Sequence, residues 1–154
     1  MTGFQRWVEE RFNIPLDGYA ALHRWSIDYP ESFWLAIWEY CGVQGTHSDE
    51  VLRHADQFPG AKWFPGARLN FAENLLRYRD DRPALIGLLE TGKRRTLSYG
   101  ELFASVSKLA NALRRHGIAP GDRVAGFMPN VIETVVAMLA TTSIGAIWSS
   151  CSPD

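Results

Sequence analysis

The sequence predicts an α/β fold in which a helical and irregular N-terminal part precedes a β-hairpin and a βαβ unit. In residues 1–83, apolar residues recur at helical spacing and no clear strand pattern occurs. From residue 84 onward, short apolar runs alternate with helical patterns, which is typical of strands joined by helices. We therefore expect an N-terminal cap region over residues 1–83 and the start of a second domain over residues 84–154.

Three helices are predicted at the start of the chain. Residues 4–12 place large apolar side chains on one helical face, and Pro15 is expected to end that segment. Residues 17–27 form a second, short candidate. The third helix runs through "PESFWLAIWEY", with Pro30 in the first turn and Gly42 as a natural C-terminal cap.

A fourth helix is predicted after a loop over residues 44–50 and an irregular stretch. Asn70 can cap its start, and Glu73 occupies the capping-box position three residues later. We expect the helix to end at Asp80. Its apolar residues are Phe71, Leu75, Leu76 and Tyr78.

The segment "GLLETGKRRT" raises the possibility of a phosphate-binding loop. Gly87, Gly92 and Lys93 fit the pattern G-x-x-x-x-G-K, but Arg94 stands where a Ser or Thr should bind Mg²⁺. In such a loop the lysine also lies at the mouth of a helix, so that backbone N–H groups face the phosphates. The residues after Lys93 instead have an extended pattern.

The next helix begins too late for a phosphate loop. Ser98 and Glu101 form a capping box, which sets the helix start at about residue 99. Gly117 is expected to cap its C-terminal end. The segment before it is therefore predicted to be a β-hairpin with strands 84–89 and 94–98.

Residues 122–150 predict a βαβ unit, with strands over 123–128 and 146–150 joined by a helix over 131–143. Glu133 is the only charged residue of this helix, and its apolar residues cover more than one face. Such a helix must be buried, and two strands and a hairpin are too little to bury it. We therefore expect the chain to be the N-terminal piece of a larger protein, and the isolated piece to self-associate.

Composition and charge exclude several function classes. The chain has 154 residues and a net charge of −1, so it offers no basic surface for nucleic acid. It shows neither a secretory signal nor an apolar run long enough to span a membrane. Cys41 and Cys151 are then expected to be thiols in a cytoplasmic protein.

Motifs for catalysis and metal binding are also missing from the sequence. The four histidines do not pair at helical spacing, and neither a CxxC nor a G-x-S-x-G motif occurs. We therefore predict no catalytic residue and no metal ligand. In a βαβ unit, ligands bind beyond the carboxyl ends of the strands, which here are "MPN" at 128–130 and "SSCSPD" at 149–154. An ordinary surface loop is the alternative interpretation of the second segment.

Three segments resemble the AMP-forming acyl-CoA synthetases, which belong to the adenylate-forming superfamily. They are "ALHRWSIDYPESFWLAIWEYCGV", "WFPGARLNFAENLL" and "GDRVAGFMPNVIETVVAMLATTSIGAIWSSCSPD". The second segment and the ending "GAIWSSCSPD" favour the acetoacetyl-CoA synthetase branch, and an acetyl- or propionyl-CoA synthetase is the alternative. The resemblance implies that this chain is part of the N-terminal domain of an adenylate-forming enzyme.

The resemblance also implies a reaction. The complete enzyme would use ATP, Mg²⁺ and CoA to convert a small carboxylate, acetoacetate, first to an acyl-adenylate and then to a thioester. The catalytic motifs of the family lie beyond this chain, so none of these cofactors is expected to bind to it alone. By proximity alone, the resemblance also implies that Trp148, Ser149, Ser150 and Ser152 border the region where the acyl group and CoA meet. A free-standing, non-catalytic interaction module is the rival hypothesis.

Overall fold

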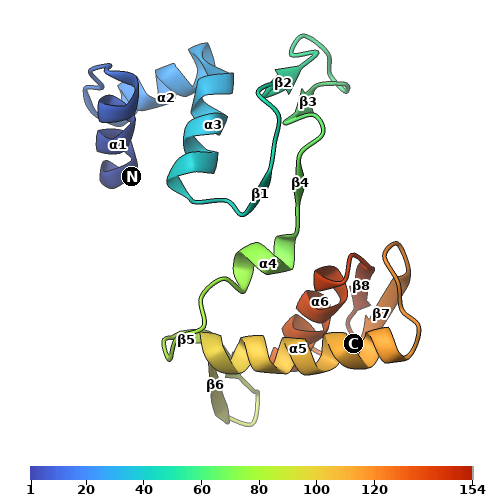
Figure 1. Ribbon diagram of the computed structural model, residues 1–154. Coiled ribbons are helices and arrows are strands. Elements are labelled where there is room, and N and C mark those ends of the chain that lie inside the picture. The colour runs from blue at the N-terminus through green and yellow to red at the C-terminus, as the bar shows by residue number, and fades with distance from the viewer. Residues whose placement is uncertain (154) are drawn as a thin grey trace. The chain divides into compact units, whose positions relative to one another are not determined.

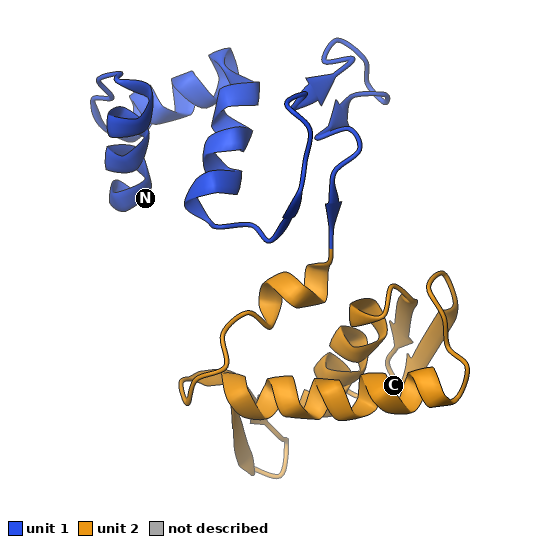
Figure 2. Cartoon of the chain, in the orientation of Figure 1, with its two compact units in different colours: residues 1–69 blue, residues 70–154 orange. Residues whose placement is uncertain are grey.

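The computed structural model describes residues 1–153. The chain divides into two compact units, unit 1 over residues 1–69 and unit 2 from residue 70 onward (Figures 1 and 2). This division lies earlier than the change of sequence pattern at residue 83. The reason is that Ala72 and Leu76 are buried in the core of unit 2, although they precede the first strand of that unit.

Unit 1 begins with the three expected helices, α1 (Thr2–Phe12), α2 (Gly18–Asp28) and α3 (Pro30–Tyr40). The first of them ends before Pro15, because Asn13 adopts a left-handed conformation with φ of 51° and its N–H bonds to the Glu9 carbonyl. The three helices pack around one small core (Figure 1). Its buried residues are Phe4, Val8, Leu16, Leu22, Trp25 and Ala36.

The ends of α3 follow the sequence signals closely. Pro30 occupies the first turn, where a missing N–H costs nothing. At the other end Gly42 takes a positive φ of 58°. Its N–H donates to the Glu39 carbonyl, and the N–H of Val43 donates to the Trp38 carbonyl, both at 3.0 Å. This is the glycine-capped helix end that the sequence predicted.

The rest of unit 1 contradicts the expectation that residues 1–83 lack strands. Strand β1 (Gly45–Thr46) pairs with β4 (Arg68–Leu69), and β2 (Leu52–Arg53) pairs with β3 (Lys62–Trp63), both antiparallel. Each strand has two residues, which is too short to produce a recognisable alternation in the sequence. The predicted loop over 44–50 therefore contains a strand.

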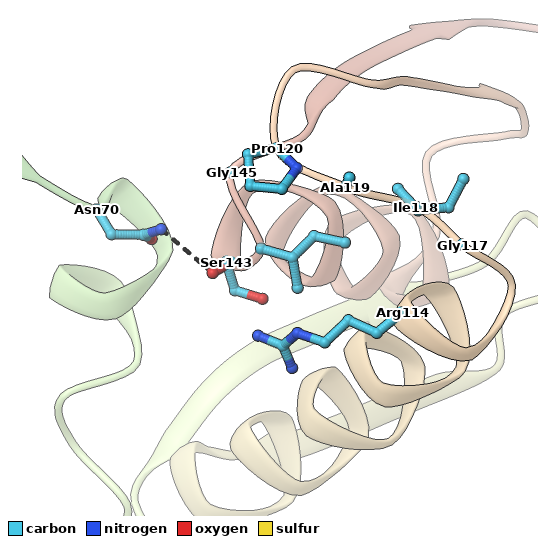
Figure 3. Close-up of a pocket in the computed structure, with 9 residues that line it drawn as sticks. Asn70, Arg114, Gly117, Ile118, Ala119, Pro120, Ser143 and Gly145 are labelled. Atoms are coloured by element: carbon cyan, nitrogen blue, oxygen red, sulfur yellow. Dashed lines mark hydrogen bonds between the residues drawn. The ribbon is translucent and has the colours of Figure 1, made fainter.

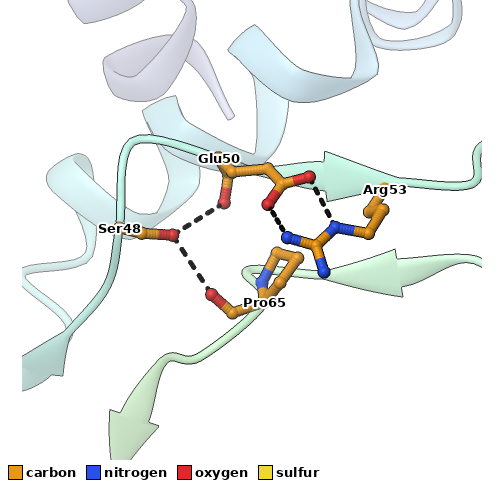
Figure 4. A network of polar contacts seen from close by, with 4 residues as sticks. All are labelled: Ser48, Glu50, Arg53 and Pro65. Atoms are coloured by element: carbon orange, nitrogen blue, oxygen red, sulfur yellow. Dashed lines mark hydrogen bonds and ion pairs between the residues drawn. The ribbon is translucent and has the colours of Figure 1, made fainter.

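A polar network holds the segments beside β2 and β3 together (Figure 4). The Glu50 carboxylate accepts from Arg53 Nε at 2.7 Å, and this bond holds the pKa of Glu50 below its ordinary value. Ser48 Oγ donates to the Pro65 carbonyl at 3.1 Å, and the Glu50 carbonyl lies 3.4 Å from the same hydroxyl. The Ser48–Pro65 bond links the chain entering β2 to the chain leaving β3, and the other bonds order the segment around Glu50.

Unit 2 starts with α4 (Phe71–Leu75), which is shorter than predicted. The cap is confirmed, since Asn70 Oδ1 accepts the N–H of Glu73 at 3.1 Å. The end expected at Asp80 is wrong. Only one turn of this helix meets the core, through Ala72 and the following Leu76, while Phe71 and Leu75 stay exposed. Without burial there is little to stabilise further turns.

The hairpin prediction is confirmed. Strand β5 (Pro83–Leu88) pairs antiparallel with β6 (Arg94–Ser98). The turn between them is closed by the Leu89 N–H, which donates to the Lys93 carbonyl at 3.0 Å, while Gly92 takes a φ of 76°. Lys93 thus lies in a tight turn between two strands, and the segment is not a phosphate-binding loop.

Helix α5 (Tyr99–Arg115) starts and ends where the sequence places it. Ser98 Oγ accepts the Glu101 N–H, and the Glu101 carboxylate accepts the Ser98 N–H at 2.8 Å, which completes the capping box. At the other end Gly117 takes a φ of 83°, and Ile118 N–H donates to the Leu113 carbonyl. Purely local chemistry therefore sets both ends of the longest helix.

The βαβ unit is also confirmed, with β7 (Arg123–Phe127), α6 (Ile132–Ser143) and β8 (Ile147–Cys151). The two strands are parallel and directly paired. Helices α5 and α6 pack on each other, and α4 also contacts α6 (Figure 1). The buried core residues of unit 2 are Ala72, Leu76, Leu102, Val106, Ala110, Leu139, Ala140, Ile144 and Ala146.

The other elements of unit 2 bury only part of the apolar surface of α6, as the sequence suggested. Leu139, Ala140 and Thr141 are at most 2% exposed, whereas Val135 and Met138 are only partly buried. None of the helices in residues 1–153 has the length and apolar character that crossing a bilayer would require. The observed architecture is the α/β fold that the sequence predicted, with the addition of the short strands of unit 1.

One buried polar group in α6 leads to a prediction. Thr141 is 0% exposed, and its hydroxyl has no hydrogen-bond partner among the described residues. Replacing Thr141 with Val removes this unsatisfied hydroxyl and is expected to raise the free energy of unfolding by about 1 kcal/mol. Thr142→Val is the matched control, because the Thr142 hydroxyl donates to the Met138 carbonyl at 2.9 Å and its loss should destabilise. Urea unfolding of both variants measures the difference; an equal loss in both would contradict the expectation.

Candidate functional site

The carboxyl ends of β7 and β8 meet at one edge of unit 2. Gly126 pairs with Ser150 and Phe127 with Cys151 in the parallel ladder. The ladder continues past the strand, since Met128 N–H donates to the Cys151 carbonyl at 3.2 Å. In parallel α/β sheets this is the edge where ligands bind, so we treat it as the candidate site and call it the carboxyl edge.

The four residues expected near a ligand all lie along or directly after β8. Ser149 and Ser150 are exposed strand residues, Ser152 follows the strand and is exposed, and Trp148 is partly buried. Neighbouring residues of a strand point to opposite faces, so Trp148 and Ser150 share one face and Ser149 lies on the other. The structure thus brings these residues to the carboxyl edge, but their side chains do not converge on one point.

The two faces of the β7–β8 pair differ sharply in exposure. Helix α6 contacts both strands, and one face holds the partly buried Val124 and Trp148 and the buried Gly126. Every residue of the opposite face is exposed, with Phe127 at 72% and Ile147 at 53%. Sheets of parallel strands are normally covered on both faces. The exposed face consists of Arg123, Ala125, Phe127, Ile147, Ser149 and Cys151.

The Trp148 indole lies directly against the backbone of β7. A Cβ added at Gly126 would lie 2.5 Å from Cη2 and 2.9 Å from Cζ2 of Trp148, and 3.4 Å from the Met128 sulfur. Only glycine leaves room for the ring at this position. Sequence reasoning had placed Trp148 near a ligand but had missed its partners Gly126 and Met128, because no sequence pattern reports a diagonal contact between strands.

The start of α6 contributes a second part of the carboxyl edge. Thr134 Oγ1 donates to the Pro129 carbonyl at 2.7 Å, which ties the segment after β7 to the first turn of the helix. Beside it lies a small pocket of about 110 Å³ between the hairpin and α6. The pocket is lined by Gly87, Leu88, Leu89, Arg95, Asn130, Val131, Ile132 and Glu133.

Arg95 and Glu133 form an ion pair across this pocket, between β6 and α6. The hydrogen bond from Arg95, helped by a backbone N–H, holds the pKa of Glu133 below its ordinary value of 4.5. Both side chains are more than half exposed, so solvent screens the pair and its contribution to stability stays below about 1 kcal/mol.

This pair predicts a pH dependence. Because the pKa of Glu133 is lowered in the folded state, the stabilisation is fully present above pH 4.5 and is lost as pH falls through the folded-state value. Glu133→Gln should therefore lower the free energy of unfolding at pH 7, with the difference from the parent shrinking below pH 4.5. Denaturant unfolding at several pH values tests this. The double variant with Arg95→Gln should lose no more than either single variant, and additive losses would show that the pair does not interact.

A larger, open groove lies at the opposite edge of unit 2 (Figure 3). It measures about 740 Å³ and lies where α5 and α6 end and the strands begin. Asn70 Nδ2 donates there to the carbonyls of Thr142 at 3.0 Å and Ser143 at 3.3 Å, while the Arg114 side chain extends along the groove. This is the amino edge of the parallel strands, so its size does not make it the better ligand site.

Comparison with known proteins decides the family. The model of the AMP-binding enzyme family matches residues 71–154, and the model of the acetyl-coenzyme A synthetase N-terminus matches residues 19–75. The chain belongs to the AMP-binding enzyme family. The two matches meet close to the division between units 1 and 2.

Relatives within the AMP-binding enzymes are similar over the whole chain. Acetoacetyl-coenzyme A synthetase of Rhizobium meliloti (strain 1021) is 49% identical over 100% of this chain and 24% of its own length. Malonamoyl-CoA synthetase of Penicillium aethiopicum is 41% identical over 100% of this chain and 22% of its own length. The solved structure of acetoacetyl-CoA synthetase from Streptomyces lividans matches with a TM-score of 0.91 and 46% identity, over 99% of this chain and 24% of that one.

These matches bear out the family resemblance that the three sequence segments carried. They also show that this chain spans about a quarter of the length of the AMP-binding enzymes it resembles. No group of three or more His, Cys, Asp or Glu side chains that could hold a metal comes together within residues 1–153.

Proposed function

We propose that this chain is the N-terminal part of an ATP-dependent acetoacetate–CoA ligase. The observation that carries the proposal is the similarity to acetoacetyl-CoA synthetases along the entire chain, in sequence at 49% identity and in structure at a TM-score of 0.91. Residues 1–83 would form its N-terminal cap region, and residues 84–154 the start of its AMP-binding domain. Residues 70–83 of this proposed cap region lie in unit 2, where Ala72 and Leu76 are part of the core.

The reaction we propose for the complete enzyme has two steps. A carboxylate oxygen of acetoacetate attacks the α-phosphorus of ATP, which releases pyrophosphate and leaves acetoacetyl-AMP. The CoA thiolate then attacks the acyl carbon, AMP leaves, and the thioester remains. Mg²⁺ would neutralise phosphate charge in the first step. No group of three or more His, Cys, Asp or Glu side chains that could hold a metal forms within residues 1–153, so we assign none of these side chains to Mg²⁺.

We propose that this chain helps to form the substrate site of that enzyme through its carboxyl edge. The carboxyl edge, with Trp148, Ser149, Ser150 and Ser152, would border the region where the acyl group and CoA meet. We assign no catalytic role to these residues. ATP, CoA and the carboxylate would bind in the complete enzyme and not to the 154-residue chain alone. The enzyme would work in the cytoplasm, with neither nucleic acid nor membrane as a partner.

The carboxylate is the open part of the proposal. A relative at 41% identity is named for malonamoyl-CoA. The malonamoyl and acetoacetyl groups differ by only a few atoms. A pocket discriminates between such acids by a few kcal/mol at most unless it pairs with their polar groups. Acetate, propionate and malonamate are therefore the competitors that the assay must include.

The experiment compares the complete gene product with the 154-residue chain. Each is mixed with ATP, Mg²⁺, CoA and one carboxylate, and both pyrophosphate release and thioester formation are followed. We expect the complete protein to form acetoacetyl-CoA with the highest kcat/KM of the series, and the short chain to form none. Thioester from the short chain would refute its role as an inactive part, and no thioester from the complete protein would refute the ligase assignment.

The isolated chain is also expected to self-associate. The exposed face of β7–β8 carries Phe127 and Ile147, and α6 is incompletely covered, so association would bury apolar surface. Light scattering over a hundredfold range of concentration, from about 1 to about 100 μM, tests this. A monomer at every concentration would contradict it.

A further inference from the structure

Three residues come together at the end of β7. They are Gly126, Met128 and Trp148. The Trp148 ring and the Met128 sulfur both approach the point where a side chain at Gly126 would begin, at 2.5 and 3.4 Å. The sulfur and the ring therefore lie beside the same backbone position, and a thioether and an aromatic ring that approach each other attract.

This contact lies at the point where β7 gives way to the segment before α6. Residues 128–131 form that segment, which we call the β7 exit loop. It has few other restraints: Met128 N–H donates to the Cys151 carbonyl, Val131 N–H donates to the Pro129 carbonyl at 2.9 Å, and Thr134 Oγ1 also bonds to that carbonyl. Pro129 and Asn130 are exposed. The Trp148 ring thus packs on the end of the strand from which the loop leaves.

The position of the loop matters because it forms one wall of the carboxyl edge. A ligand at this edge lies between the ends of the two strands, and Trp148 comes from one strand while the loop follows the other. A side chain of the wrong volume at residue 148 would let the loop collapse or would push it outward. Gly126 is the complementary half of the arrangement, since any Cβ there would displace the ring.

We propose that Trp148 is a positioning residue for substrate binding: through Gly126 and Met128 it fixes the β7 exit loop, and with it the width of the carboxyl edge where the acyl group and CoA meet. This inference rests on the proposed ligase function for the identity of the substrates. The positioning itself rests only on the contacts within unit 2.

The test uses the complete protein, four variants at residues 126 and 148, and one control variant. Trp148→Ala removes the ring, and Trp148→Phe keeps an aromatic face of smaller size. Gly126→Ala pushes the intact ring away, and Gly126→Ala combined with Trp148→Phe gives the added methyl group room. Ile144→Ala is the control, because Ile144 is buried in the core of unit 2 but lies at its amino edge.

Two readouts are measured on each protein. Hydrogen exchange reports the loop directly, and we expect Trp148→Ala and Gly126→Ala to speed exchange of the Met128 and Val131 amides roughly tenfold or more relative to the Ile144→Ala control. Steady-state kinetics reports the substrate site, and we expect a rise of roughly tenfold in KM for acetoacetate or CoA, with a smaller change in kcat and none in KM for ATP. The Phe variant and the double variant should fall between these and the parent.

The outcomes separate this inference from the proposed function. If the parent protein makes no acetoacetyl-CoA, the ligase assignment fails, and the exchange measurement still decides whether Trp148 holds the loop. Loop exchange in Trp148→Ala equal to that in Ile144→Ala overturns the positioning role. Faster loop exchange with all KM values unchanged, or with only KM for ATP raised, overturns the link to the acyl and CoA site.

Discussion

Replacing Leu139 with Ala is expected to lower the free energy of unfolding of unit 2 by about 3 kcal/mol. Leu139 is 2% exposed and is among the largest fully buried side chains of the described residues. It lies in the core where α6 packs on α5, together with Val106 and Ala110. Truncation removes the transfer energy of three carbon atoms and leaves a cavity, because two packed helices relax little toward each other.

The matched control for this prediction is Leu75→Ala. The chemical change is the same, but Leu75 is 46% exposed at the end of α4, so the expected loss is well below half as large. Urea unfolding followed by circular dichroism measures both variants, and hydrogen exchange of the α6 amides assigns the loss to unit 2. Equal destabilisation by the two substitutions would show that α6 does not form the centre of this core.

The parts of the fold that the sequence predicted are those that local chemistry determines. Ser98 and Glu101 can bond to each other's backbone wherever the rest of the chain lies, so the sequence alone was enough to predict the start of α5. Gly42 and Gly117 mark helix ends for the same reason, since both adopt positive φ. The hairpin followed from where α5 had to start. The βαβ unit followed from apolar runs long enough to show their period.

The parts that were wrong or missed depend on partners far away in the sequence. Strand β1 exists because Gly45 meets Leu69, and nothing near Gly45 in the sequence reports this. Helix α4 stops after one turn because only Ala72 and Leu76 reach the core. A capping residue predicts where a helix begins, but packing decides how far it continues.

The candidate site shows the same contrast between what local sequence determines and what distant partners determine. The rule that ligands bind at the carboxyl ends of parallel strands singled out the carboxyl edge, and the structure places the four predicted residues along it. The rule cannot give the direction of a side chain or its contacts. The contact of Trp148 with Gly126 needs the register of the two strands, which pairs Val124 with Trp148, and that register appears only in three dimensions.

Trp25→Ala is expected to lower the free energy of unfolding of unit 1 by about 4 kcal/mol. Trp25 is 8% exposed in a core of few residues, and its ring meets Phe12 at 5.3 Å and Phe33 at 6.1 Å between centroids. Edge-to-face contacts of this kind add to the apolar area that the indole removes from water. The three helices that share this core are short, with 11 residues each, so packing and not helix propensity must hold them.

Trp34→Ala tests whether this loss comes from burial. Trp34 lies on α3, the helix after the one that carries Trp25, and is 44% exposed. Its ring centroid is 5.7 Å from that of Trp63. The same truncation there removes less buried area and should cost less than about half as much. Hydrogen exchange of the α1 and α2 amides in both variants measures the difference within unit 1. If Trp34→Ala proved the more damaging, the organising contacts of unit 1 would lie between α3 and β3, and the three-helix core would depend on them.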